Sequence, residues 1–149
     1  MQLTSDTLDP RRHLDIEGAY NIRDLGGYPT AEGGRTRWGV LLRADGLQGL
    51  PVRSQAALID YGIRTVIDLR TSKEIQQKPG AFFGSSEVAY WHQNMTGDVL
   101  PYHKSVTGTV YDRILEVYTG ILDLRQSVIR EALATLAAPG ALPALFHCN

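Results

Sequence analysis

The chain of 149 residues is long enough for one domain with a hydrophobic core, and its 43% hydrophobic and 21% charged residues are typical of a globular protein. A formal net charge of −1 excludes a global basic field that would attract nucleic acid. One cysteine excludes an internal disulfide framework, and the four histidines lack the spacing of metal ligands. No apolar run approaches the roughly 18 residues of a membrane span, and there is no N-terminal signal core. We therefore expect a protein that is cytoplasmic or secreted without a classical signal peptide.

The N-terminal part combines a polar segment with a turn that contains glycines. Residues 1–15 are interpreted as an arm or a first surface strand. In the segment 19–28, Gly26 and Gly27 permit a tight turn, and Asp24 can bond to nearby backbone. This segment is therefore either a hairpin corner or a rigid loop that supports a site.

A strand, a helix and a second strand are expected next. Residues 38–44 alternate loosely between apolar and polar and predict a strand. Residues 51–61 predict a helix, because Pro51 suits an early helical position and Gly62 stands where a C-terminal cap belongs. The apolar segment 64–70 follows directly and is typical of a buried parallel strand. Helix, glycine cap and buried strand together indicate an α/β unit.

Charged residues stand at the ends of both strands. Arg43 and Asp45 end the first, and Asp68 and Arg70 close the second. Ligands of open α/β sheets bind at the carboxyl ends of strands, so Asp68 and Arg70 are candidate site residues. Arg43 and Asp45 are expected either to contact substrate or only to brace the segment 21–28. Asp68 and Arg70 can equally be a structural ion pair that ties down the next loop, and both interpretations stay open.

The middle of the chain predicts short elements and one long loop. Residues 71–77 predict one or two helical turns, and residues 88–92 predict a strand. The segment from Gln93 to Gly108 contains glycine and proline and predicts a loop. Loops of this length are often functional, and Asp98 is one of its ionisable groups.

The C-terminal part predicts helices and a final strand. Residues 110–138 carry apolar helical faces, with a break expected at Gly120 or Asp123. The apolar run 141–146 then predicts a short buried strand that leads to Cys148. A cysteine at a strand end can open a phosphate-binding loop, in which backbone N–H groups stabilise a thiolate and hold an anion. The alternative for Cys148 is a small buried hydrophobe, as most lone cysteines are.

Several segments of the chain form a pattern when they are taken in order. They are Asn21 to Tyr28, Leu42 to Asp45, Gly62 and Ile63 with Val66 to Arg70, Glu74, and Leu145 to Cys148. Together they resemble the bacterial tyrosine-phosphatase family that includes secreted mycobacterial and listerial enzymes acting on phosphoproteins and phosphoinositides. The resemblance extends from residue 20 to residue 148, and the order of the segments is more specific than any one of them. The resemblance implies an α/β fold with a central, largely parallel sheet flanked by helices.

The family pattern at the site is His-Cys-x-x-Gly-Lys-Asp-Arg-Thr-Gly, of which this chain supplies His147, Cys148 and Asn149. We therefore expect residues 1–149 to form one phosphatase-like domain that holds the N-terminal portion of the fold and is incomplete at its C-terminus. The arginine that would bind phosphate bidentately, and the helix after the loop, would come from the rest of a longer protein or from a complementing C-terminal fragment.

The resemblance implies that Cys148 attacks phosphorus as a thiolate and forms a cysteinyl-phosphate, without a metal or another cofactor. His147 would orient the loop that Asn149 enters. The acid that protonates the leaving oxygen would be Asp98 or an aspartate of the family's loop beyond this chain. The residues expected to bind substrate or to support the loop are Asp24, Arg43, Asp45, Asp68, Arg70, His147 and Asn149.

The expected function is hydrolysis of phosphotyrosine, with phosphoserine, phosphothreonine and phosphoinositides as further substrates. The partner is therefore a phosphoprotein or a phospholipid, and the chain by itself is expected to be inactive until the loop is completed. A non-catalytic fragment or binding module without the loop arginine is the main alternative. A rhodanese-like sulfur carrier also places a cysteine at a strand end, but the segments 21–28 and 68–70 speak against it.

Overall fold

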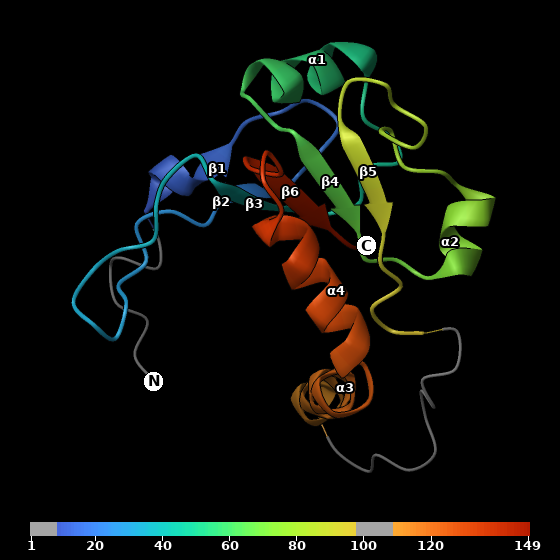
Figure 1. The fold of residues 1–149 in the computed structure, drawn as a ribbon. Helices are drawn as coiled ribbons and strands as arrows, with labels where there is room; N and C mark the ends of the chain where they lie inside the picture. The colour runs from blue at the N-terminus through green and yellow to red at the C-terminus, as the bar shows by residue number, and fades with distance from the viewer. Residues whose placement is uncertain (1–8, 98–108) are drawn as a thin grey trace.

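One mixed sheet organises the residues that the computed structural model describes, which are 9–97 and 109–149 (Figure 1). Within them, six strands follow the order β1-β2-β3-β6-β4-β5. The strands are β1 (His13–Leu14), β2 (Ile22–Asp24), β3 (Leu41–Ala44), β4 (Thr65–Asp68), β5 (Ala89–His92) and β6 (Ala144–His147). The first three pair antiparallel, and β3, β6, β4 and β5 pair parallel. The predicted α/β fold with a largely parallel sheet is confirmed.

The strand that leads to the cysteine lies in the middle of the sheet. β6 pairs with β3 on one side and with β4 on the other, so Ala44, His147 and Asp68 are aligned across three strands. Because these strands are parallel, their carboxyl ends reach the same edge of the sheet. The residues that follow the strand ends therefore leave the sheet side by side.

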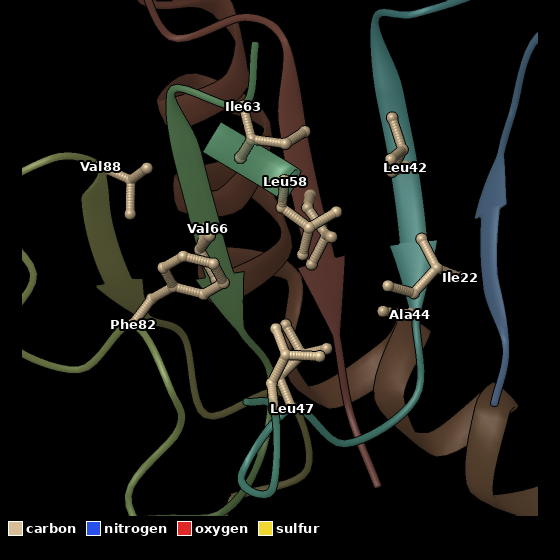
Figure 2. Close-up of a cluster of buried hydrophobic side chains, with 11 residues drawn as sticks. Ile22, Leu42, Ala44, Leu47, Leu58, Ile63, Val66, Phe82 and Val88 are labelled. Carbon is tan, nitrogen blue, oxygen red and sulfur yellow. The ribbon is translucent and has the colours of Figure 1, made fainter. Parts of the chain in front are cut away.

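The hydrophobic core lies on one face of this sheet. Leu42, Val66 and Leu145 are neighbours in register, and all three are fully buried. Leu58 of α1 (Val52–Asp60) belongs to the same cluster of buried side chains (Figure 2). Burial of these apolar side chains is the main free-energy term that holds the sheet and α1 together.

Helix α1 begins after Pro51 and is followed by Gly62, as predicted. Gly62 has a φ of 106°, in the region that favours glycine, and its N–H donates to the carbonyl of Ile59 at 2.9 Å. The chain then turns directly into β4, all of whose residues are buried. This confirms the predicted sequence of helix, glycine cap and buried strand.

A reciprocal hydrogen-bond pair begins the short helix α2 (Ser72–Gln77). The Glu74 N–H donates to Thr71 Oγ1 at 3.3 Å, and the Thr71 N–H donates to Glu74 Oε2 at 2.9 Å. The helix lies near the carboxyl end of β4 (Figure 1). The expected one or two helical turns are therefore confirmed.

The four strands predicted from residue 38 onward are all shorter than predicted. β4 covers Thr65–Asp68 of the predicted 64–70, and β5 covers Ala89–His92 of the predicted 88–92. β3 begins at Leu41 rather than at residue 38, because Gly39 has a φ of 68° and donates its N–H to Asp24 Oδ2 at 2.7 Å. β6 begins at Ala144 rather than at residue 141 and runs through His147. Residues 141–143 of the predicted strand therefore belong to the segment that precedes β6.

The break in the helical segment 110–138 lies at Arg125, not at Gly120 or Asp123 as predicted. The helices are α3 (Val110–Leu124) and α4 (Gln126–Ala137). Arg125 Nη2 donates to the carbonyl of Asn94 at 2.7 Å. This contact joins the helix junction to the segment after β5, which is a tertiary interaction that the helical periodicity does not contain.

The apolar faces of α3 and α4 form as helical faces but do not join the core of the described residues. No residue of either helix is buried. The large exposed apolar side chains on them are Val110, Tyr111, Ile114, Leu115, Tyr118, Leu122, Leu124 and Leu133. Ala134 and Thr135 of α4 line a shallow hollow together with Thr65 and Trp91 of the sheet. Thus the periodicity predicted the helices, but it did not predict their exposure.

Candidate active site

Cys148 follows directly after β6 and is a free, exposed cysteine. Although its surface is exposed, burial of the thiol by the surrounding atoms is the largest cause that raises its pKa above the usual value. The Asn149 backbone N–H acts against this rise, and the nearby carboxylates of Glu74 and Asp68 add to it. Among the described residues, the sulfur therefore has a mainly acidic surrounding, which Arg70 offsets only in part.

His147 immediately precedes the cysteine and is buried, with only 1% of its surface exposed. Its Nε2 lies 3.4 Å from Asp68 Oδ2. Burial lowers the pKa of His147 below its usual value and outweighs the attraction to Asp68, so the ring is neutral at neutral pH. The ring therefore fixes the end of β6 by packing and by its contact with Asp68.

Asp68 and Arg70 form a buried ion pair at the end of β4. Arg70 Nη2 lies 2.6 Å from Asp68 Oδ2, and Arg70 Nε donates to Asp68 Oδ1 at 2.9 Å. Tyr90 donates its hydroxyl to the same Oδ2 at 2.8 Å. Burial opposes the ionisation of Asp68, but these donors and His147 hold the pKa of the carboxyl below its usual range.

Arg70 also reaches the loop that follows α2. Its Nη1 donates to the carbonyl of Lys78 at 3.0 Å. A Cβ at Gly80 would lie 3.3 Å from both Arg70 Nη2 and Asp68 Oδ2, so the loop backbone closes over the pair. The structural ion pair, one of the two interpretations of Asp68 and Arg70, is therefore present.

Asp24 and Asp45 brace the segment 19–28. Asp24 accepts hydrogen bonds from the Gly26 N–H at 2.7 Å and from the Tyr61 hydroxyl at 3.0 Å. Asp45 accepts from the backbone N–H groups that begin the segment, at 3.1 Å and 3.2 Å. Residues 22–24 of this segment form β2, one strand of the β2–β3 hairpin. The hydrogen bonds to Asp24 and Asp45 also hold the segment in place. The hairpin is therefore confirmed, and the support of a site by this segment stays a prediction.

The glycines in this segment are required by close packing. A Cβ on Gly26 would lie 2.6 Å from the Trp38 backbone. Gly27 has a φ of 75°, and a Cβ there would lie 2.5 Å from the Trp38 ring. Arg12, whose Nε donates to the Gly26 carbonyl at 2.9 Å, stacks on the Tyr28 ring. These contacts fix the loop whose start Asp45 holds.

One predicted site residue is not brought to this cluster, and another lies outside the described residues. Arg43 is exposed and aligns with Phe146, so its side chain leaves β3 on the face opposite that of His147. Asp98 lies outside the described residues, as does most of the predicted loop from Gln93 to Gly108. The proposed roles of Arg43 and Asp98 stay predictions.

Asn149 makes contacts that sequence analysis missed. Gln48 Nε2 donates to Asn149 Oδ1 at 3.0 Å, and Asn149 Nδ2 donates to Glu74 Oε1. Sequence analysis did not select Gln48, Glu74 or Tyr90 as site residues. The spacing of Thr71 and Glu74 is a capping-box signal that identifies the helix start, but no local signal identifies Gln48 or Tyr90.

The described residues offer no group of three or more His, Cys, Asp or Glu side chains that could hold a metal. Over the same residues, no helix is both long and apolar enough to cross a membrane. What the carboxyl edge does offer is one thiol, a buried neutral histidine and a set of carboxylates already bonded to protein groups. A thiol of this kind can act as a nucleophile once it is ionised.

The mixed sheet, with a cysteine at the carboxyl end of its central parallel strand, defines an α/β domain of the phosphatase-like class. The chain belongs to the tyrosine phosphatase family, whose sequence profile matches residues 14–149. This membership supports a phosphatase function that acts on a phosphorylated substrate. Comparison with curated proteins finds no relative that matches the chain.

Proposed function

We propose that Cys148 is the nucleophile of a phosphomonoester hydrolase. The observation that carries the proposal is a free cysteine at the carboxyl end of the central strand β6, behind a buried histidine, in a member of the tyrosine phosphatase family. The site residues that surround it, Asp68, Arg70 and His147, are assigned a supporting role, because their polar atoms bond to one another and to the protein.

The reaction proceeds in two displacements. The Cys148 thiolate attacks phosphorus, a sulfur–phosphorus bond forms, and the bond between phosphorus and the ester oxygen breaks. An acid gives the leaving oxygen a proton, so that the alcohol departs neutral. Water then attacks phosphorus, loses a proton, and releases inorganic phosphate while the thiolate is regenerated. Asp98 is our candidate for the acid, and an aspartate of the family's loop beyond Asn149 is the competing one.

Turnover requires a positively charged side chain that can bind the phosphate beside the Cys148 sulfur. Arg70 does not meet this requirement. Arg70 is the arginine that acts on Cys148, but its guanidinium is bonded to Asp68 and to the Lys78 carbonyl. Burial and carboxylates raise the thiol pKa, which leaves less thiolate than the few per cent of a free cysteine at neutral pH. We therefore propose that the rest of the phosphate loop, on the same polypeptide or on a complementing fragment, must be present for activity.

The proposed substrate is phosphotyrosine, with phosphoserine, phosphothreonine and phosphoinositides as further candidates. The test is hydrolysis of p-nitrophenyl phosphate, a phosphotyrosine peptide and a phosphoinositide by wild type and by Cys148→Ser, each with the rest of the phosphate loop supplied. Mass spectrometry of the quenched protein should detect one added phosphoryl group on Cys148. Gln76→Ala, an exposed change on α2, is the matched control. Hydrolysis by Cys148→Ser at the wild-type rate would exclude Cys148 as the nucleophile.

A non-catalytic binding module is the second candidate. The observation that favours it is the bonding of Arg70 to Asp68, since an unbonded arginine is what a phosphate transition state needs. This candidate predicts binding of a phosphopeptide without turnover, also when the C-terminal part of the loop is supplied. Calorimetric titration with a phosphotyrosine peptide, followed by a phosphate-release assay on the same sample, separates the two.

A further inference from the structure

The side chain of Asn149, the residue after the proposed nucleophile, is held from two sides. Gln48, in the segment after β3, donates from Nε2 to Asn149 Oδ1 at 3.0 Å. Asn149 in turn donates from Nδ2 to Oε1 of Glu74, which stands on α2. Because an amide has one acceptor oxygen and one donor nitrogen, this arrangement uses both ends of the side chain.

Each residue that holds Asn149 is itself held. The second carboxylate oxygen of Glu74 accepts from the Thr71 hydroxyl at 2.6 Å and from the Thr71 N–H at 2.9 Å. Gln48 Oε1 lies 3.5 Å from Arg70 Nη1, the outer limit of a hydrogen bond. Rotation of either side chain away from Asn149 would therefore disturb other bonds.

The backbone at Gly46 leaves room for this arrangement. A Cβ at Gly46 would lie 2.5 Å from Gln48 Oε1 and 2.8 Å from Asn149 Oδ1. Real Cβ atoms essentially never approach other heavy atoms so closely, so a larger residue at this position would require the two side-chain amides to shift. The observed positions of Gln48 and Asn149 thus go together with a glycine at residue 46.

We propose that Gln48 and Glu74 are positioning residues, which clamp the Asn149 side chain and so fix the backbone that leaves Cys148. The inference rests on the proposed function, since it concerns the presentation of that nucleophile. The Asn149 N–H lowers the pKa of the Cys148 thiol, so its orientation matters for the thiolate. A clamp on the side chain limits the rotation of the same residue's backbone.

The charged groups that act on Cys148 come from two elements. Glu74 of α2 and Asp68 at the end of β4 raise the pKa of the thiol, and Arg70 lowers it. The neighbouring His147 is neutral at neutral pH. Because Glu74 both clamps Asn149 and acts as a charge, its substitution changes two things. Gln48 carries no charge, so Gln48→Ala isolates the clamp.

The experiment is the pH dependence of iodoacetamide alkylation of Cys148, the only cysteine in the chain. We expect Gln48→Ala to raise the apparent thiol pKa by roughly half a unit to one unit, the range that corresponds to one hydrogen bond. Gln76→Ala, also a glutamine change but on the exposed side of α2, should leave the profile as in wild type. Circular dichroism melts establish that both variants are folded.

A second test exchanges the amide of residue 149 and the carboxylate of residue 74, so that the net charge of the protein stays constant. Asn149→Asp sets a second carboxylate against Glu74 and should raise the thiol pKa further than Gln48→Ala does. In the double variant Asn149→Asp with Glu74→Gln, the new amide can donate to the new carboxylate, and the net charge equals that of wild type. We expect its alkylation profile to return toward the wild-type profile.

The clamp would be refuted if Gln48→Ala behaved as Gln76→Ala does, or if the double variant stayed as far from wild type as Asn149→Asp alone. Alkylation requires no phosphoryl transfer. A clamp that fails in this assay therefore leaves the hydrolysis test of Cys148→Ser unaffected. Conversely, hydrolysis that survives Cys148→Ser removes the proposed function while the alkylation profiles still report on the clamp.

Discussion

Arg70 Nη2 lies 2.6 Å from Asp68 Oδ2, and neither side chain exposes more than 1% of its surface. Their side chains are thus buried away from water. The two residues flank Leu69 in the sequence, at the carboxyl end of β4. A buried pair of this kind is strongly sensitive to the loss of one partner, because the remaining charge cannot be hydrated. It is therefore the part of the site whose substitution should affect folding most.

Removal of the arginine charge should destabilise the protein severely. We expect Arg70→Met to lower the free energy of unfolding by about 3–5 kcal/mol, since it leaves the Asp68 carboxylate buried without its main partner. Urea unfolding followed by circular dichroism gives the value. Arg53→Met removes the exposed ion pair with Glu17 and should have no measurable effect. Equal effects of the two substitutions would contradict a special role for burial.

Loss of the Tyr90 hydroxyl should have a smaller effect of the same kind. Tyr90→Phe removes the hydrogen bond to Asp68 Oδ2 and keeps the ring that packs edge-on against Phe83. A hydrogen bond to a charged group contributes about 1.5–3 kcal/mol, and we expect a decrease within that range. Tyr111→Phe, at an exposed position of α3, is the matched control for urea unfolding. A loss no larger than that of the control would show that Asp68 does not need this donor.

A methyl group added at residue 80 should disturb the buried ion pair between Asp68 and Arg70. Gly80→Ala places a Cβ 3.3 Å from Arg70 Nη2 and Asp68 Oδ2, both of which are fixed by other bonds. Overpacking of this kind costs about 1–3 kcal/mol, so the melting temperature should fall. Gly49→Ala, where a Cβ meets no atom within 4 Å, should melt as wild type does. A melting temperature unchanged in Gly80→Ala would mean that the loop moves away freely.

The stability should depend on pH through His147. Burial lowers the folded-state pKa of this histidine, so the unfolded chain binds more protons between the folded value and the unfolded value of about 6.5. The contribution of His147 is therefore complete above about pH 6.5 and is lost as the pH falls through the folded pKa. Urea unfolding at a series of pH values below 7 should show a shallower decline for His147→Asn than for wild type. Parallel curves would contradict this assignment.

Local chemistry allowed much of the fold to be predicted. The helix 51–61 was identified by Pro51 and Gly62, whose conformations depend on neighbours in sequence, and the short apolar run of β4 indicated a buried strand. The residues at the carboxyl ends of the strands were also recognised, because parallel topology alone brings them to one edge. Asp68 and Cys148 were found in this way and His147 through the family resemblance, although their roles stay predictions.

The parts that could not be predicted depend on contacts between distant segments. The helix junction at Arg125 is tied to the Asn94 carbonyl, 31 residues away, and Gln48 meets Asn149 across 101 residues. Neither contact leaves a period or a turn signal in the sequence. The face on which Arg43 leaves β3 could not be predicted for a similar reason, since alternation along β3 becomes informative only when the register with β6 is known.

The central place of β6 has a consequence for the order in which the sheet can form during synthesis. Strands β1 to β3 and strands β4 to β5 make two separate ribbons, and the ladder between them exists only through β6, which follows both in sequence. A ribosome releases those ribbons first, with an unpaired edge on β3 and another on β4. We expect the amides on the β6 side of β4, such as that of Leu69, which donates to the His147 carbonyl, to gain protection from hydrogen exchange only when residues 144–147 have emerged. Nascent chains that end before residue 144 should therefore exchange freely at those amides. The strand that leads to Cys148 is then also the last one to join the sheet.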